Sequence, residues 1–288
     1  MQAPVEHVAI IGLGLIGSSI ARAVRKRLPG VRLSAYDLDE AVRKRALTLQ
    51  LADLVAHQPA HAVAGADLVI LCVPVGSMKT AAQSVAEHLQ PATLVSDVGS
   101  SKAAVAALLR EALPHARIIP AHPVAGTENS GPDSGFPELF MDRWCILTPD
   151  EDARAEDVER LSTFWGALGA RVEVMEAAHH DRVLAVTSHL PHLIAFAMVE
   201  TAADLERVTE NEIIKYSGGG FRDFTRIAAS DPSMWRDIFL TNKEAVLDML
   251  QHFTTNLTHL QRAIEQEDSE ALFSLFTRAR AVRRRLVE

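Results

Sequence analysis

The chain has 288 residues, of which 48% are hydrophobic and 23% are charged, and its formal net charge is −8 at pH 7. This length allows two domains with substantial cores, and this composition is typical of a globular protein. The acidic balance gives no electrostatic reason to expect binding to nucleic acid or to an anionic membrane. An anionic substrate must therefore meet a local cluster of cationic side chains.

The cysteines and the N-terminal segment indicate the cellular compartment in which the protein acts. Cys72 and Cys145 are too few for a disulfide framework or a thiolate metal site. Residues 1–6 carry neither a basic region nor a long apolar segment, and we expect no apolar run long enough to cross a membrane. These features predict a cytoplasmic protein.

The stretch from residue 7 to residue 37 has the pattern of a dinucleotide-binding unit. An apolar run breaks into a Gly-x-Gly-x-x-Gly turn and continues as a helical segment. Gly12 permits the turn, Gly14 lets the main chain approach a pyrophosphate, and Gly17 lets the helix pack against the strand. A glycine-rich turn in another kind of α/β protein is the alternative.

A second strand-like run supports the dinucleotide hypothesis. It ends in Asp37, twenty residues after Gly17, where a carboxylate would bind the adenosine ribose of NAD and repel the 2′-phosphate of NADP. We therefore expect NAD rather than NADP. The expected cofactor contacts in this unit are Gly12, Gly14, Leu15, Ile16, Gly17 and Asp37.

Predicted strands and helices alternate as far as residue 174, which indicates a Rossmann-type, mostly parallel sheet with helices on both faces. Val73 and Pro74 end one strand at the carboxyl edge of the sheet, where cofactors bind in such folds. The turn-rich segment 129–137 is expected to be a loop that can close over a ligand. Beyond it, the strands 144–149 and 170–174 are expected to complete the same sheet.

Only helical periodicity follows residue 176. We therefore predict an α/β protein with a dinucleotide-binding domain at 1–176 and an all-α domain at 177–288.

His122 follows the predicted strand 117–121 at the carboxyl edge. An imidazole at this place could accept a proton from a substrate hydroxyl while hydride leaves the same carbon, although a hydrogen-bonded loop histidine is the alternative. Ser100 and Ser101 follow the preceding strand. One hydroxyl could contact the same substrate oxygen while the other caps the next helix.

The helical part contributes further candidates. His189 and His192 are three residues apart and share one face of a helix, but no spacing of histidines and carboxylates supports a metal site. Three consecutive glycines at 218–220 indicate close backbone approach or unusual dihedrals. Arg222 and Arg226 follow, and one of them could bind a substrate carboxylate, with a surface ion pair to Asp223 or Asp231 as the alternative.

Five motifs carry a resemblance to a known family: 12–17, 97–102, 122–128, 188–192 and 218–226. Together they resemble the prephenate/arogenate (cyclohexadienyl) dehydrogenase family of tyrosine biosynthesis, from about residue 8 to the C-terminus. The resemblance implies NAD(P)-dependent oxidative decarboxylation of prephenate or arogenate. It also implies a homodimer formed through the helical domain.

The resemblance also assigns roles to single residues. His122 would bond the ring hydroxyl and take its proton, Ser100 would contact the same hydroxyl beside the cofactor, and Arg226 would bind a substrate carboxylate. The adjacent Ser101 leaves the choice of contacting serine open. The other expected substrate contacts are His192, His189, Thr127, Gly220 and Trp235.

Two other functions stay open from the residues alone. A β-hydroxyacid or imine-type NAD(P) dehydrogenase shares this architecture but would need a lysine or an acid on the first long helix after the sheet, where this chain has His189 and His192. A non-catalytic NAD-sensing dimer would leave His122 unexplained. The sequence does not decide between prephenate and arogenate, and it does not show whether tyrosine inhibits.

Overall fold

The computed structural model describes residues 4–206 and 215–285. The chain divides into two compact units, Met1–Lys243 and Glu244–Glu288, which are described separately. The first unit holds the sheets and every residue of the candidate site. The domain boundary expected near residue 176 stays a prediction.

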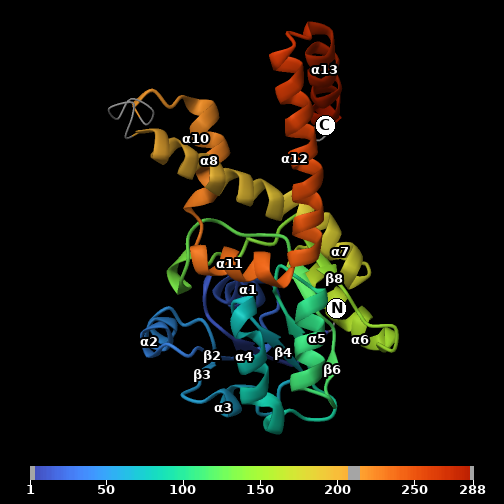
Figure 1. Ribbon diagram of the computed structural model, residues 1–288. Helices are drawn as coiled ribbons and strands as arrows, with labels where there is room; N and C mark the ends of the chain where they lie inside the picture. The colour runs from blue at the N-terminus through green and yellow to red at the C-terminus, as the bar shows by residue number, and fades with distance from the viewer. Residues whose placement is uncertain (1–3, 207–214, 286–288) are drawn as a thin grey trace. The chain divides into compact units, whose positions relative to one another are not determined.

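A six-stranded parallel sheet forms the centre of the first unit (Figure 1). Its strand order is β3-β2-β1-β4-β5-β6, as in dinucleotide-binding folds, so the predicted fold class is confirmed. The strands are β1 (His7–Ile11), β2 (Arg32–Tyr36), β3 (Leu54–Val55), β4 (Leu68–Leu71), β5 (Leu94–Asp97) and β6 (Arg117–Ile118). The helices between and after them are α1 (Leu15–Arg27), α2 (Glu40–Thr48), α3 (Pro59–Val63), α4 (Met78–Val85), α5 (Ala103–Ala112) and α6 (Ala155–Ala167).

The side chains of β1 alternate between two buried clusters, because successive residues of a strand point to opposite faces. Val8 and Ile10 belong to a cluster with residues of α1, α2 and α6. Ala9 and Ile11 belong to a second cluster with residues of α3, α4 and α5. Both faces of the sheet are therefore covered, which leaves its carboxyl edge as the place for a site.

The expectation of one continuous sheet is wrong. The predicted strand 117–121 breaks at Pro120, which has no N–H to continue the ladder with β5. The last main-chain bond to β5 runs from Ile119 N–H to the Val95 carbonyl, at 3.0 Å. A separate sheet follows, with β7 antiparallel to β8 and β8 parallel to β9. Its strands are β7 (Ala121–Pro123), β8 (Trp144–Leu147) and β9 (Arg171–Val174).

The described residues beyond 176 are helical, as predicted. The first unit continues with α7 (Ala177–Leu184), a π-helical turn (Ala185–His189), α8 (Leu190–Glu206), α10 (Gly219–Thr225), a 3₁₀ turn (Arg226–Ala229) and α11 (Pro232–Thr241). Asp231 begins α11 because its carboxylate accepts the Met234 N–H at 2.9 Å. Most of α12 (Lys243–Glu265) and all of α13 (Ser269–Arg285) form the second unit.

The helical stretch Ala177–Leu205 corrects a second expectation. Its 29 residues are long and apolar enough, by length and composition alone, to cross a membrane. Core helices of proteins outside membranes pass the same test, so this finding is weak evidence for a span. The stretch also carries the buried polar side chains of His180, Asp181 and His189.

Candidate active site

The glycine turn is required by the packing of the chain itself. Gly12 has φ +100°, and a Cβ at this position would lie 2.3 Å from the Cys72 carbonyl oxygen. A Cβ at Gly17 would lie 2.0 Å from the Gly12 carbonyl oxygen, whereas a Cβ at Gly14 would meet nothing within 4 Å. No side chain caps the start of α1. The main-chain N–H groups at Leu15 and Ile16 therefore suit a phosphate group.

Asp37 and the end of β4 lie beside this turn. The Asp37 carboxylate accepts the Leu13 N–H at 2.7 Å and the Asp39 N–H at 2.9 Å. A Cβ at Gly12 would lie 3.1 Å from the Val73 side chain, and Pro74 follows Val73 directly. The fold thus brings the predicted cofactor residues together at one edge of the sheet.

His122 lies on β7 at the start of a buried hydrogen-bonded chain. Its Nδ1 is 2.8 Å from Nε2 of His180, and Nδ1 of His180 is 2.8 Å from Oδ1 of Asp181. The same carboxylate accepts the main-chain N–H groups of Lys102 and Ala103, at 2.7 and 2.9 Å. His122 and Asp181 are only 8% and 5% exposed. We call His122, His180 and Asp181 the imidazole relay.

The surroundings keep both imidazoles of the relay neutral. Burial lowers the pKa of His122 well below its usual 6.5, and the charges of His180 and Lys102 act in the same direction. Burial also lowers the pKa of His180, against the opposing effect of Asp181. Burial alone would raise the pKa of Asp181, but its three hydrogen bonds outweigh that effect and hold the pKa below its usual range. Asp181 is thus ionised at neutral pH.

Charge and donor geometry fix the protons of the relay. The Asp181 carboxylate can only accept, so His180 donates from Nδ1 and its Nε2 accepts from Nδ1–H of His122. The proton of neutral His122 then sits on Nδ1, which leaves a lone pair on Nε2. Within the described residues, nothing hydrogen-bonds this Nε2. His122 is therefore a neutral acceptor at the carboxyl edge, as a general base must be.

A buried ion pair holds the strand that carries His122. Lys102 Nζ contacts the carboxylate of Asp97 and donates to the Ala121 carbonyl at 2.7 Å, and Asp97 accepts the Ala121 N–H at 3.2 Å. Both charged side chains are 0% exposed. Sequence reasoning missed this pair, because no local pattern shows that residues 97 and 102 meet residue 121.

The two serines have different surroundings. Ser101 is buried and its hydroxyl pairs with Thr241 Oγ1 at 2.9 Å. The half-buried Ser100 hydroxyl has no hydrogen-bond partner among the described residues. The expectation that one serine caps the next helix is wrong, because the Asp181 carboxylate performs this role at the start of α5.

The helical elements contribute a second group of side chains, of which His189 and Trp235 are buried. His192 stacks on Trp235 with ring centroids 3.6 Å apart, and its Nδ1 lies 2.9 Å from the Ser188 carbonyl. Trp235 also meets the ring of His189 at 6.1 Å. Burial lowers the pKa of His192, and the charge of Arg226 acts in the same direction, so these two side chains share one region.

One ion pair connects this group to the loop that follows His122. Arg226 pairs with Glu128 at 3.4 Å rather than with Asp223 or Asp231, and Glu128 lies on the loop that leaves β7. Thr127 is exposed on this loop, and its hydroxyl accepts the Asn129 N–H at 3.3 Å. The side chains of Arg226 and Glu128 are 62% and 42% exposed.

The glycines at 218–220 do not have the predicted geometry. None has a positive φ, and a Cβ on any of them would meet nothing within 4 Å in the described chain. Gly218 is the N-cap residue of α10, and Gly220 lies within that helix. Gly220 is therefore close to Arg226 in the sequence, but no described residue packs against it.

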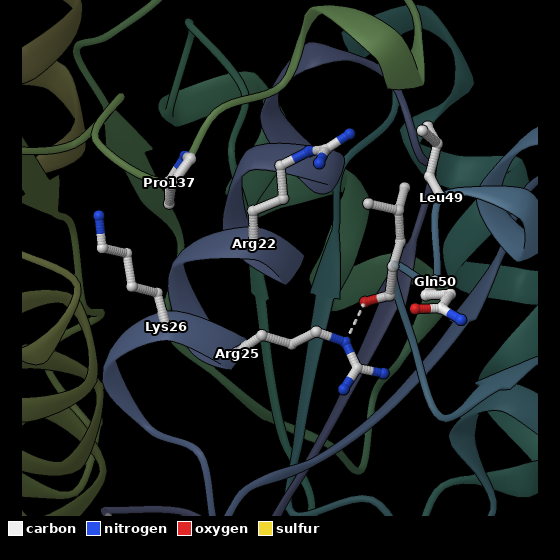
Figure 2. Close-up of a pocket in the computed structure, with 7 residues that line it drawn as sticks. Arg22, Arg25, Lys26, Leu49, Gln50 and Pro137 are labelled. Atoms are coloured by element: carbon white, nitrogen blue, oxygen red, sulfur yellow. Dashed lines mark hydrogen bonds between the residues drawn. The ribbon is translucent and has the colours of Figure 1, made fainter.

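The expected ligand loop 129–137 and one cavity both lie against α1. The loop 129–137 is anchored to α1, since Ser19 Oγ accepts the Phe136 N–H at 3.1 Å. A cavity of about 350 Å³ lies along α1, and Figure 2 shows the side chains that line it. Two of its cations have partners in the chain: Arg25 donates to the Leu51 carbonyl at 3.2 Å and Lys26 pairs with Glu138. No predicted site residue lines this cavity.

A parallel sheet with a glycine turn and a buried acid–base relay at one edge defines a Rossmann-type nucleotide-binding protein. Residues 20–174 match the family description "Prephenate dehydrogenase, nucleotide-binding domain", and residues 176–278 match "Prephenate dehydrogenase, dimerization domain". The chain belongs to the prephenate dehydrogenase family, as its motifs predicted. It is therefore an oxidoreductase.

Individual relatives agree with this assignment. The chain is 46% identical to the cyclohexadienyl dehydrogenase of Zymomonas mobilis, over 96% of this chain and 95% of that protein. It is 34% identical to the prephenate dehydrogenase of Bacillus subtilis, over 96% of this chain and 75% of that protein. The crystal structure of the Aquifex aeolicus prephenate dehydrogenase with hydroxyphenyl propionate and NAD⁺ superposes with a TM-score of 0.92 at 34% identity, covering 98% of both chains.

Proposed function

We propose that this chain catalyses the NAD-dependent oxidative decarboxylation of prephenate, arogenate or both, as a step of tyrosine biosynthesis. The observation that carries the proposal is the imidazole relay, which leaves an unprotonated Nε2 of His122 at the carboxyl edge of the sheet. Such a group can take the proton of a ring hydroxyl while the carbon that bears it is oxidised.

The residues at the glycine turn fit NAD. The free N–H groups at the start of α1 suit the pyrophosphate, and the carboxylate of Asp37 suits the ribose hydroxyls and disfavours a 2′-phosphate. Bound NAD⁺ supplies the hydride acceptor. The residues that would hold it are Gly12, Gly14, Leu15, Ile16, Gly17, Asp37, Val73, Pro74 and Ser100.

His122 is the proposed base, and Ser100 is proposed to contact the same ring hydroxyl. The ionised Asp181 stabilises positive charge that develops on the imidazoles when His122 takes the proton. Loss of carbon dioxide makes the substrate ring aromatic, so the chemistry itself supplies the driving force. The protein's task is to align the reactants and to stabilise developing charge.

The substrate's anionic groups require cations, which the helical elements supply. Arg226 is proposed to bind a substrate carboxylate in exchange for its exposed pair with Glu128. The stacked pair of His192 and Trp235 would form a flat wall of the pocket. The other proposed contacts are His189, Thr127 and Gly220.

We further propose a homodimer that forms through a helical domain at 177–288 and acts in the cytoplasm, beside a nucleotide-binding domain at 1–176. The match to a dimerization domain over residues 176–278 supports this proposal. The second unit also exposes several large apolar side chains, which an interaction surface would cover. They include Leu247, Leu257, Ile264, Phe273 and Phe276.

A steady-state assay of prephenate and arogenate, each with NAD⁺ and with NADP⁺, tests the proposed function. We expect turnover of at least one substrate with NAD⁺ and a lower kcat/KM with NADP⁺. Absence of turnover with both substrates would refute the proposed reaction. A preference for NADP⁺ would refute the role given to Asp37.

A further inference from the structure

Asn242, directly after α11, is a buried side chain that the proposed reaction does not use. It is 5% exposed, and its amide nitrogen Nδ2 is 2.9 Å from the main-chain carbonyl of Asp181 and 3.0 Å from Nδ1 of His189. It therefore joins α7, which carries His180 and Asp181 of the imidazole relay, to the histidine at the end of the π-helical turn. Such turns are frequent at functional sites.

The carbonyl of Asp181 fixes the orientation of this amide. A carbonyl can only accept a hydrogen bond, so the Asn242 atom that faces it must be the NH₂ group and not the oxygen. The same NH₂ group then donates its second hydrogen to Nδ1 of His189. Nδ1 of His189 is consequently an acceptor and carries no proton.

The proton of His189 must then lie on Nε2. Burial lowers the pKa of His189 to about 4, so the ring is neutral at pH 7 and has a single N–H. Nε2 is buried and has no hydrogen-bond partner in the described part of the chain. The main chain of Ser100 lies near the ring and opposes the effect of burial on this pKa, but it forms no hydrogen bond of normal distance and angle with Nε2.

We propose that Asn242 is a positioning residue that holds His189 in its Nε2–H tautomer, so that His189 donates a hydrogen bond to an oxygen atom of the bound substrate. The inference rests on the proposed function for the identity of that substrate. An unpaired buried donor is costly, and an acceptor on the ligand removes that cost. The donor is neutral, so it discriminates by geometry and adds no charge to a site where Arg226 already supplies one.

Nitrogen NMR of the protein with ¹⁵N-labelled histidine reads the tautomer directly, because protonated and unprotonated ring nitrogens differ in chemical shift. In the unaltered protein we expect His189 to show a protonated Nε2 and an unprotonated Nδ1. The reverse pattern would overturn the proposal without any variant having to fold. Adding hydroxyphenyl propionate with NAD⁺ should shift the Nε2 signal, and an unchanged signal would also overturn it.

A double-mutant cycle separates positioning from simple structural support. Asn242→Ala should raise the KM for the substrate about 3- to 10-fold, the loss expected for one hydrogen bond, and change kcat less than about 2-fold. In a His189→Leu background, the same substitution should change KM by less than about 2-fold, because no ring nitrogen is left to orient. An equal rise in both backgrounds would show that Asn242 acts by another route.

Gln83→Glu provides a control for amide replacement in general, because Gln83 is an exposed amide on α4. It should leave KM and kcat unchanged. Failure of the proposed function would appear as lack of turnover by the unaltered protein with either substrate. Failure of this inference would appear in the tautomer or in the cycle, while turnover persists.

Discussion

The candidate site combines a buried, internally paired part with an open one. His122, Asp97 and Lys102 are at most 8% exposed, and each is hydrogen-bonded within the chain. Arg226, by contrast, is 62% exposed, with one ion pair at 3.4 Å. The chain itself therefore organises the groups that would handle the proton, whereas the exposed guanidinium of Arg226 depends on the ligand for its final geometry.

The largest effect on stability should follow from breaking the buried pair. Lys102→Met leaves the Asp97 carboxylate buried without its partner and should lower the free energy of unfolding by about 3–5 kcal/mol. Urea denaturation measures this change. The matched control is Lys79→Met, whose partner Glu111 is exposed, with an expected loss of at most about 1 kcal/mol. Equal losses in the two variants would contradict the contrast between the two parts.

Replacing the exposed cation should affect binding and leave stability nearly unchanged. Arg226→Ala removes a charged hydrogen bond to the substrate worth about 1.5–3 kcal/mol, so KM should rise roughly 10- to 100-fold. The free energy of unfolding should change by less than about 1 kcal/mol, because the pair with Glu128 is exposed. Steady-state kinetics with an unchanged KM would remove the role assigned to Arg226.

The two glycine clusters should respond in opposite directions. Gly17→Ala forces a Cβ to 2.0 Å from a carbonyl oxygen and should cost about 1–3 kcal/mol of stability, together with weaker NAD binding. Gly220→Ala lies in α10 with open space around it and should stabilise by about 0.5–1 kcal/mol. Thermal unfolding of both variants measures these changes in stability. Destabilisation by Gly220→Ala would contradict the open space around this position.

The smallest expected effect is on pH dependence near neutrality. His122 acts as a base only when neutral, and a lowered pKa keeps it neutral down to pH values below 6.5. The kcat/KM for the substrate should therefore vary less than about 2-fold between pH 6.5 and about 7.5, and fall only at lower pH. An acidic limb centred at or above pH 6.5 would mean that burial does not depress this pKa.

Much of the dinucleotide-binding unit could be predicted from the sequence because its geometry is local. Gly12 and Gly17 are needed within one turn of chain, and the spacing to Asp37 reflects a single strand–helix–strand unit. The break at Pro120 was missed because a proline was counted as the continuation of an apolar strand. Pro74, by contrast, is expected to end a strand, and β4 does end before it.

The relay could not be predicted in the same way. His122 and His180 are 58 positions apart in the chain and meet only because β7 leaves the main sheet beside α7. Asp181 serves both as the helix cap that we expected from a serine and as the anion that orients His180. The roles of Lys102 and Asn242 likewise depend on tertiary contacts, which no spacing in the sequence encodes.

In the proposed mechanism, His122 accepts the substrate proton because the relay leaves its Nε2 unprotonated. The most direct test is the kcat of His122→Asn with the preferred substrate and saturating NAD⁺. Asparagine can still hydrogen-bond to His180, so folding should persist, while kcat should fall by about two to four powers of ten with a much smaller change in KM. A folded variant that keeps kcat within about 3-fold of the unaltered protein would contradict the account, because general base catalysis alone is worth more than that.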